Sequence, residues 1–269
     1  MPPQAPIASG RTATIWAAPR GRILKLCAEG FGPDEPQREA RAARWARQCG
    51  LPVPAPGRVV VRETPTGFRY GHYQTRIEGQ NGIARIMAGK VDFLGEAEDL
   101  VHRQVAVWAH PGGRLESRRQ RIARRIVALD MLTESERQRL LMILEGLPEG
   151  DCLLHGDFHP GNLIHGADQV WIVDWIDAAR GVPAADVARC LVLFGEDLIG
   201  PLPTEDPIVT DHRRQYRERY LSTIHGLPMA ATERLDDWVL VTSAARLLDP
   251  IPEERDLRLA WVKCQLRCR

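Results

Sequence analysis

Residues 163–173 constrain the fold of this chain more than any other stretch, because they have the pattern of a tight β-hairpin. Leu163–His165 and Trp171–Val173 are short apolar arms, and the five residues between them, Gly166 to Val170, are turn-like. Apolar arms of strand-forming residues on both sides of such a segment predict two antiparallel strands. We therefore expect a hairpin here, with its open end at residues 162 and 174.

The register of this hairpin decides which polar side chains meet at its open end. With five loop residues, the arms pair His165 with Trp171, Ile164 with Ile172 and Leu163 with Val173. The same register places Asn162 opposite Asp174, so that an amide oxygen and a carboxylate lie together. Hard oxygen ligands on a rigid ribbon are what Mg²⁺ requires, and phosphate oxygens and water complete its octahedron. Asn162 and Asp174 are thus predicted magnesium ligands.

A third oxygen-bearing side chain precedes the hairpin, in a loop shaped by Gly and Pro. Asp157 comes five residues before Asn162, within the sequence His-Gly-Asp-Phe-His-Pro-Gly-Asn-Leu-Ile of residues 155–164. Phosphoryl transfer needs in-line positioning, neutralised phosphate charge and an acceptor for the hydroxyl proton of the substrate. Asp157 fits the last role, because Asp-x-x-x-x-Asn is the spacing of the protein-kinase catalytic loop. A second Asp, at the end of an apolar strand after the Asn, makes the pattern more specific.

The first 79 residues predict a small sheet with one inserted helix. The sequence Asp34-Glu35-Pro36 predicts a helix start, with Pro36 at the first helical position, and Gly50 and Pro52 end this helix. The strand patterns, which are separated by clusters of turn-forming residues, cover 12–17, 22–26, 58–62 and 68–77. Residues 78–82 break this pattern and mark the predicted boundary between a first lobe, 1–79, and a second lobe, 80–269.

Beyond residue 80 the hydrophobic period becomes helical. Apolar residues three and four apart predict helices in 100–109 and along the stretch 115–147, and again from 184 to the end, with a Pro-rich loop at 200–207. The predicted fold class is α+β, with two lobes. A small β-rich N-terminal lobe with one helix precedes a larger α-helical C-terminal lobe that contains the catalytic loop, 155–162, and the metal-binding hairpin, 162–174.

These motifs resemble those of the aminoglycoside phosphotransferase family, the small-molecule branch of the protein-kinase-like fold. The likeness covers most of the chain and is strongest over 153–186, which includes Leu-Leu-His-Gly-Asp-Phe-His-Pro-Gly-Asn-Leu-Ile and Val-Asp-Trp-Ile-Asp-Ala. The resemblance implies a two-lobed kinase-like fold, with Asp157 as the catalytic base and Asn162 and Asp174 as magnesium ligands. It also implies a structural role for Asp186.

The resemblance further implies a lysine in a first-lobe strand that reaches the nucleotide phosphates and is held by a glutamate on the next helix. Lys25 is flanked by apolar residues and is the only Lys before Lys90. Glu39 is its expected partner, and Glu35 competes for that role. A buried ammonium needs a nearby carboxylate, which supports this pairing. Taken alone, Lys25 fits equally an edge-strand lysine that keeps the sheet soluble.

Two further parts of a nucleotide site are implied by the resemblance. A loop over the phosphates is expected at Ser9 and Gly10, although this segment has one glycine and no Gly-x-Gly-x-x-Gly pattern. A backbone hinge for the base is expected at Ile77 and Glu78, before Gly79. The residue that bonds the base is left open. The expected cofactors are Mg²⁺ and ATP, with GTP as the alternative donor.

The charge distribution suits this function. The whole chain has a net charge of +1, which argues against a protein that coats nucleic acid. Residues 1–80 have 12 Lys and Arg against 6 Asp and Glu, whereas the remainder has 24 against 29. A basic first lobe and an acidic second lobe are consistent with a polyanion bound by the first lobe and a metal ion bound by the second. The same distribution is also expected from a chance imbalance of charges on solvent-exposed faces.

No window of the sequence approaches the ~20 apolar residues of a membrane span, and the N-terminus lacks the pattern of a secretory signal. The six cysteines are scattered, and only Cys264 and Cys268 are at helical spacing, which does not complete a zinc site. We expect reduced thiols, a cytoplasmic protein, and neither membrane nor nucleic acid as a partner. The oligomeric state is left open.

Two other functions fit part of the pattern. The cluster His155-x-Asp157-x-His159 resembles the ligand sets of zinc hydrolases, and His165 lies nearby. In that case zinc would remain bound through dialysis, whereas a kinase uses His155 and His159 only to shape the loop. The third function is a kinase-shaped binding protein without catalysis, which the glycine-poor loop near Gly10 leaves open.

The phosphate acceptor is expected to be a small molecule with a hydroxyl group, and specifically a cationic one such as an aminoglycoside or another amine-bearing antibiotic. This would give the chain a role in antibiotic resistance. The expectation depends on an acidic cluster in the second lobe: Glu196, Asp197, Glu205, Asp206 and Asp211. Asp197 and Asp177 are the substrate-contacting candidates. The cluster fits solvated loop charges equally well, and Asp177 fits a turn cap.

Overall fold

The computed structural model describes residues 5–10, 12–64, 67–195 and 207–269. The chain divides into two compact units, Met1–Ala88 with Pro160–Ala178 (unit 1) and Gly89–His159 with Ala179–Arg269 (unit 2). The segment with the predicted hairpin therefore belongs to the same compact unit as the first part of the chain. This division differs from the predicted one, which separates the chain once, between residues 79 and 80.

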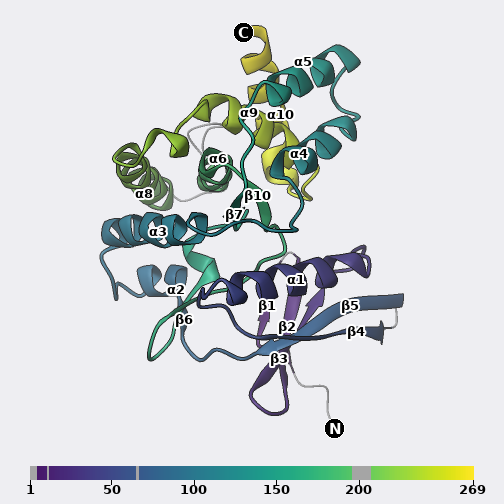
Figure 1. The fold of residues 1–269 in the computed structure, drawn as a ribbon, viewed down its shortest axis with the longest axis vertical. Coiled ribbons are helices and arrows are strands. Elements are labelled where there is room, and N and C mark those ends of the chain that lie inside the picture. Colours follow the sequence, from purple (N-terminus) through teal and green to yellow (C-terminus); the bar gives the residue numbers. More distant parts are fainter. Residues whose placement is uncertain (1–4, 11, 65–66, 196–206) are drawn as a thin grey trace. The chain divides into compact units, whose positions relative to one another are not determined.

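Unit 1 is built on a five-stranded antiparallel sheet with the order β1-β2-β3-β5-β4 (Figure 1). Four of these strands agree with the predicted ones to within a few residues: β2 (Ala13–Ala18), β3 (Arg22–Cys27), β4 (Pro56–Thr64) and β5 (Gly67–Thr75). The short strand β1 (Ala8–Ser9) was not predicted, and Ser9 was expected in a loop. The turn between β2 and β3 contains Arg20 and Gly21, both with positive φ, which is the left-handed conformation that glycine tolerates best. β3 is central in the sheet, so side chains on its inner face are buried.

Helix α1 (Asp34–Gln48) lies along one face of this sheet (Figure 1). Its buried residues are mainly alanines, which allow the helix to pack closely on the strands. Asp34 and Glu35 in its first turn complement the positive end of the helix dipole. Pro36 was predicted to be the first helical residue, but the helix begins at Asp34 and Pro36 is its third residue. Pro is tolerated throughout the first turn because those N–H groups have no intrahelical partner.

A second, three-stranded sheet completes unit 1, in the order β6 (Gln80–Asn81), β8 (Leu163–His165) and β9 (Val170–Ile172). Helix α2 (Gly82–Met87) follows β6, and the short 3₁₀ segment η1 (Pro160–Asn162) precedes β8. Because β6 pairs with β8, the hairpin packs with the first 88 residues. Gly79 allows this pairing, since a Cβ there would lie 2.3 Å from the carbonyl oxygen of His165.

Unit 2 is mainly helical, as predicted (Figure 1). Within it α6 packs against α9, and α3 packs against α8. The predicted helical stretch 115–147 is two helices, because Thr133 and Glu136 form a capping box that starts a new helix. The helices are α3 (Phe93–Trp108), α4 (Arg118–Val127), α5 (Glu134–Glu145), α6 (Pro183–Phe194), α8 (Pro207–His225), α9 (Leu235–Arg246) and α10 (Pro252–Arg267), with the 3₁₀ segment η2 (Met229–Ala231) before α9.

A two-stranded sheet, β7 (Cys152–Leu154) with β10 (Ala179–Gly181), leads into the predicted catalytic loop. Leu153 and Leu154 are fully buried, so the start of this loop is fixed in the core of unit 2. Hydrophobic burial of this kind is the main stabilising contribution to a folded domain.

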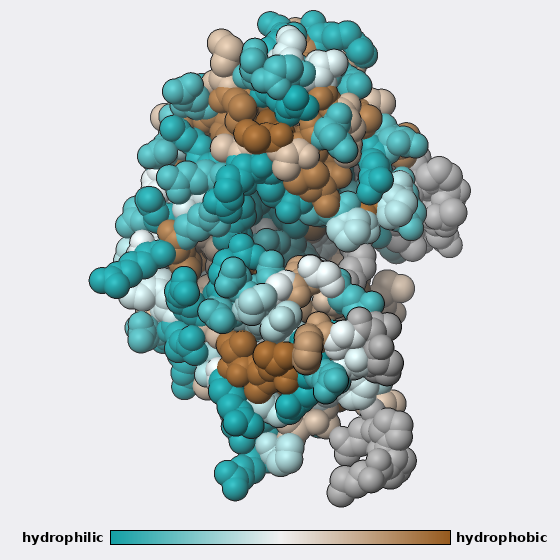
Figure 2. Space-filling model, turned by 90° about the vertical axis from the view of Figure 1, so that its right-hand side faces the viewer, coloured by the Kyte–Doolittle hydropathy of each residue, from teal (hydrophilic) through white to brown (hydrophobic). Residues whose placement is uncertain are grey.

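On the face seen in Figure 2 the surface is mainly hydrophilic, and apolar side chains gather in separate patches. The most exposed large apolar side chains are Met87, Met229, Met142 and Phe68. All six cysteines are described, and none of them forms a disulfide in the structure. Within the described residues, no helix combines the length and the apolar character needed to cross a membrane.

Candidate active site

Lys25 is the centre of a buried ion-pair cluster in unit 1. Its side chain extends from β3, its residue exposure is 5%, and it is therefore a core lysine and not an edge-strand lysine. Its Nζ atom lies 2.7 Å from Oε1 of Glu39 and 2.6 Å from Oδ1 of Asp174. Two carboxylates from different elements thus hold one ammonium.

The structure also decides between the two candidate partners of Lys25. Glu39, on α1, is 2% exposed and bonds Lys25, whereas Glu35 pairs with Arg38 at 3.7 Å. Burial alone would lower the pKa of Lys25, but the charges of Asp174 and Glu39 and their hydrogen bonds raise it above its usual value. The ammonium therefore remains charged.

The hairpin that supplies Asp174 has a different register from the predicted one. Leu163 pairs with Ile172, Ile164 with Trp171 and His165 with Val170. The prediction was wrong by one residue because the loop has four residues and not five: the N–H of Gly166 bonds the carbonyl of Gln169, at 3.0 Å. In the observed register two core side chains, Leu163 and Ile172, face each other, and burial of one face fixes the register.

Asn162 therefore lies opposite Val173 and not opposite Asp174. Its carbonyl accepts a hydrogen bond from the N–H of Val173 at 3.0 Å, and the residue is buried. Asp174 follows with φ of 65°, in the left-handed region that Asp enters more readily than most residues. The two predicted metal ligands are thus held by adjacent positions of paired chain segments.

The chemistry of this pair fits Mg²⁺. One carboxylate and one amide supply hard oxygen atoms, and a magnesium site of this kind takes its remaining ligands from phosphate and water. The side chain of Asp174 is 25% exposed, which leaves it accessible from solvent. No group of three or more His, Cys, Asp or Glu side chains among the described residues is arranged as a metal site of the all-protein kind.

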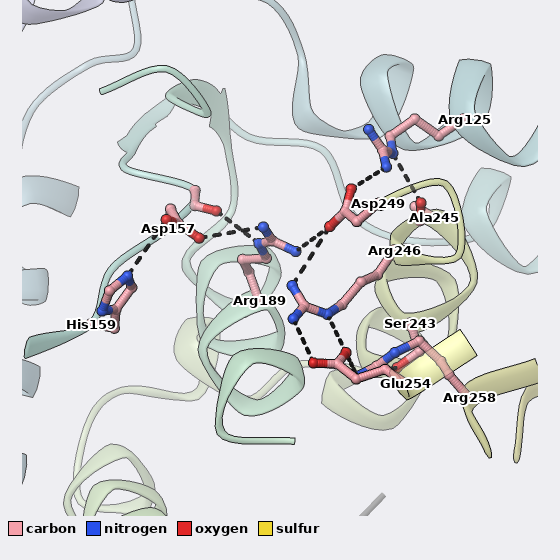
Figure 3. Close-up of polar contacts among 11 residues, drawn as sticks. Arg125, Asp157, His159, Arg189, Ser243, Ala245, Arg246, Asp249, Glu254 and Arg258 are labelled. Atoms are coloured by element: carbon pink, nitrogen blue, oxygen red, sulfur yellow. Dashed lines mark hydrogen bonds and ion pairs between the residues drawn. The ribbon is translucent and has the colours of Figure 1, made fainter. Parts of the chain in front are cut away.

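Asp157 belongs to unit 2, in the loop between β7 and η1. Nη2 of Arg189 lies 3.3 Å from its Oδ1 atom, and Nε2 of His159 lies 3.6 Å from its Oδ2 atom (Figure 3). Its backbone N–H donates to Nδ1 of His155 at 3.3 Å. Burial alone would raise the pKa of Asp157, but the hydrogen bond with His159 and the charges of Arg189, His159 and His155 hold it well below its usual range.

Asp186, in the first turn of α6, supports this loop. Its Oδ1 atom accepts the N–H of Gly156 at 2.8 Å, where the chain has φ of 79°. Its Oδ2 atom accepts from Nε1 of Trp108 at 3.0 Å and from Nε2 of Gln104 at 3.1 Å. Asp186 is 1% exposed, and both oxygens of its carboxylate accept hydrogen bonds. This agrees with the structural role that the family resemblance implied.

Of the remaining predicted nucleotide residues, Ser9, Gly10 and Glu78 lie at exposed positions of unit 1, and Ile77 is half-buried. Ser9 is in β1, and the N–H of Gly10 bonds the carbonyl of Ala13 at 2.9 Å. Ile77 and Glu78 follow β5, which ends at Thr75. Glu78 pairs with Arg76 at 2.6 Å.

The predicted substrate residues have different outcomes. Asp177 is half-buried, in a turn that follows Trp175. Asp197 lies outside the described residues, as do Glu196, Glu205 and Asp206. Asp211 is on α8, where it pairs with Arg214 and accepts from Gln215 at 2.6 Å, as a charge on a helix surface does.

Two residues near the site were missed by the sequence analysis. Arg189, on α6, contacts Asp157, and only its position three residues after Asp186 hinted at a place near the loop. His72, on β5, pairs in register with Lys25, and its residue exposure is 1%. Burial, and then the charge of Lys25, lower the pKa of His72 to about 4.

Comparison with known structures shows the same fold. A thermostable mutant of aminoglycoside phosphotransferase APH(4)-Ia has a TM-score of 0.63 and 16% identity, over 98% of this chain and 94% of that one. Aminoglycoside-3'-phosphotransferase of type VIII has a TM-score of 0.56 and 18% identity, over 90% and 91%. Amicoumacin kinase hAmiN has a TM-score of 0.58 and 12% identity, over 98% and 87%.

No curated protein sequence matches this chain. The family model described as the phosphotransferase enzyme family matches residues 4–238, which is most of the chain. Together with the structural neighbours, this match confirms the predicted family, the kinase-like fold with a β-rich first part and a helical second part, and the enzyme class of a small-molecule kinase. The chain therefore belongs to the phosphotransferase enzyme family.

Proposed function

We propose that this chain transfers the terminal phosphoryl group of ATP to a hydroxyl group of a small molecule, with Mg²⁺. The observation that carries the proposal is the placement of Lys25 between Glu39 and Asp174, at 2.7 and 2.6 Å. An ion pair between a strand Lys and a helix Glu, beside a metal-binding Asp, is the arrangement that kinases use to hold nucleotide phosphates.

In the proposed mechanism each residue has one task. Lys25 contacts the phosphates, and Glu39 keeps its ammonium in place. Asn162 and Asp174 would hold Mg²⁺, which when bound neutralises charge on the phosphates. Asp157 accepts the proton of the acceptor hydroxyl as the oxygen attacks, a task for which its ionised state is required. Ser9, Gly10, Ile77 and Glu78 are proposed to line the nucleotide.

ATP is the proposed donor, and related solved structures support nucleotide use. One is the ternary complex of APH(2")-IIa with streptomycin and ATP, with a TM-score of 0.52, and one is a GDP complex of aminoglycoside 2'-phosphotransferase-IIIa. The second makes GTP the donor to compare. A ternary complex of APH(4)-Ia with ADP and hygromycin B supports a cationic antibiotic as the class of acceptor.

The described residues give no support to the zinc-hydrolase alternative. His159 and Asp157 face each other, Nδ1 of His155 accepts from the backbone, and no cluster of three metal-binding side chains occurs among the described residues. No observation favours a binding protein without catalysis, because the full set of Lys25, Glu39, Asp157, Asn162 and Asp174 is present.

The test is ADP release from Mg-ATP and Mg-GTP with a panel of acceptors: hygromycin B, streptomycin, kanamycin, choline, an amino-acid alcohol and glucose. We expect at least one acceptor to stimulate ADP release and to gain a phosphoryl group in the mass spectrum. Stimulation only by uncharged sugars would contradict the cationic acceptor. Asp174→Asn is expected to weaken the binding of Mg-ATP but not of Mg²⁺-free ATP, and equal binding of Mg-ATP by both proteins would contradict the metal assignment.

A further inference from the structure

Arg189 links the loop of Asp157 to the C-terminal helices within unit 2. Its Nε atom donates to the carbonyl of Gly156 at 3.1 Å, and its Nη2 atom lies 3.3 Å from Oδ1 of Asp157. Its Nη1 atom lies 3.7 Å from Oδ2 of Asp249. The side chain is 11% exposed. All three nitrogens of one partly buried guanidinium therefore face acceptors, two of them on the loop of Asp157 and one on the segment after α9 (Figure 3).

Asp249 is itself held by two other arginines. Nη2 of Arg125, on α4, contacts its Oδ1 atom, and Nη1 of Arg246, on α9, lies 3.5 Å from its Oδ2 atom. Nε of Arg125 also donates to the carbonyl of Ala245 at 2.9 Å. Asp249 is therefore anchored by α4 and α9 independently of Arg189 (Figure 3).

The same network continues into α10. Glu254 accepts from Nε and Nη2 of Arg246 at 2.9 and 3.0 Å, a bidentate pair, and from Nη2 of Arg258 at 2.8 Å. Bidentate pairs between Arg and carboxylate fix the geometry of both partners as well as their charge. The position of Asp249, and through it that of Arg189, is thus set by three helices of unit 2.

We propose that Arg189 is a positioning residue for Asp157, and that Asp249 is the anion that holds Arg189 in this place. The proposal rests on the proposed function, in which Asp157 accepts the proton of the acceptor. Arg189 fixes Oδ1 of Asp157 and the backbone of Gly156 together, so the rotation of the carboxylate is restricted. An Arg is suited to this task because its planar fork serves several acceptors at once, whereas a Lys supplies a single point charge.

Together with the hydrogen bond from His159, the charge of Arg189 also lowers the pKa of Asp157. The charged and titratable groups around this carboxylate are Arg189 on α6, His155 and His159 on its own loop, Asp186, which bonds the adjacent Gly156, and the buried thiol of Cys190. Arg189 is the permanent cation among these groups. Because burial disfavours a carboxylate, its removal shifts Asp157 toward the neutral acid, which cannot accept a proton.

The first test measures the ionisation of Asp157 without any turnover. In ¹³C-labelled protein its side-chain carboxyl resonance is assigned by its loss in Asp157→Asn. In the wild-type protein we expect the resonance to keep its ionised position to the lowest pH at which the protein is folded. In Arg189→Gln we expect it to titrate at higher pH, and Arg189→Lys should restore most of the shift. Arg137→Gln is the matched control, since Arg137 pairs with Glu134 at 2.6 Å and donates to the carbonyl groups of Leu129 and Leu132, in the segment before α5.

The second test separates binding from turnover, with Mg-ATP and the first acceptor of the panel that stimulates ADP release. We expect Arg189→Gln to lower kcat about 10- to 100-fold and to leave KM for Mg-ATP within about twofold, because misplacement of a reacting group acts on the chemical step. Asp249→Asn should lower kcat less, in the same direction, and Arg137→Gln should leave it unchanged. Should Arg189→Gln fail to fold, the comparison is made with Arg189→Lys and Asp249→Asn.

The outcomes distinguish the two proposals. An unmoved Asp157 resonance and an unchanged kcat in folded Arg189 and Asp249 variants would overturn the positioning role. An equal loss in Arg137→Gln would overturn it as well, since the effect would then be one of general stability. A shifted Asp157 resonance in a protein that phosphorylates no acceptor would uphold the role of Arg189 and count against the proposed function.

Discussion

Replacement of Lys25 with Met tests the energetics of the buried ion-pair cluster in unit 1. The substitution keeps most of the volume of the side chain but removes its charge. Glu39, whose residue exposure is 2%, then has no cation at the 2.7 Å position that Lys25 occupies. Breaking a buried pair by removal of one partner costs about 3–5 kcal/mol. Asp174 contributes less to this cost, because its side chain is 25% exposed and can be hydrated.

The double variant Lys25→Met with Glu39→Leu separates stability from function. Replacing both partners of a buried pair with apolar residues of similar volume is often neutral, so we expect it to recover most of the free energy of unfolding that the single variant loses. Phosphoryl transfer should stay lost in both variants, since neither has an ammonium for the phosphates.

The assay is urea unfolding followed by circular dichroism, with ADP release measured on the same samples. Lys90→Met serves as the control, because Lys90 is exposed and such surface changes usually stay within about 0.5 kcal/mol. A cost below about 1 kcal/mol for Lys25→Met, or a double variant no more stable than the single one, would refute the reasoning.

Three further perturbations follow from the structure. The pKa of His72 is about 4 in the folded protein, below the 6.5 of an ordinary His side chain. The unfolded chain therefore binds a proton first as the pH falls, so the free energy of unfolding should fall by about 3 kcal/mol between pH 6.5 and 4, and His72→Phe should remove this slope in thermal unfolding. Asp186→Ala removes the carboxylate that accepts the N–H groups of Gly156, Trp108 and Gln104, and we expect the free energy of unfolding in urea to fall by more than about 3 kcal/mol. Asp186→Asn should have an intermediate effect, and an unchanged stability of Asp186→Ala would contradict the buried network. Gly79→Ala places a Cβ 2.3 Å from the carbonyl oxygen of His165 and should lower the free energy of unfolding by about 1–3 kcal/mol. Hydrogen exchange of the amides in β6 and β8 should then be faster, and exchange rates equal to those of the wild type would contradict the close approach.

Much of this fold could be predicted from local patterns. The strands of unit 1 are short runs between turn-forming residues, and α1 has clear start and stop signals. Hydrophobic periodicity and the positions of Gly and Pro were therefore sufficient to predict these elements. The pairing of Lys25 with Glu39 was implied by the family resemblance and supported by the cost of an unpaired buried ammonium, and the structure shows this pair. The motif of Asp157, Asn162 and Asp174 was visible because its residues are close in sequence.

Features that depend on three-dimensional packing could not be predicted. The hairpin register differed by one residue because core burial of Leu163 and Ile172, and not the apparent loop length, decides the pairing. The grouping of residues 160–178 with unit 1 depends on the pairing of β6 with β8, two strands far apart in sequence. Arg189 and Asp249 approach each other across 60 residues of sequence, and no local period signals such a contact.

Asp157→Asn tests whether Asp157 is the base of the proposed phosphoryl transfer. The measurement is the single-turnover rate of phosphoryl transfer from Mg-ATP to the acceptor, with binding of Mg-ATP measured on the same protein. We expect binding within about twofold of the wild type and a rate about 10²- to 10⁴-fold lower, since loss of a general base has this effect. A rate equal to that of the wild type, with intact binding, would contradict this role of Asp157.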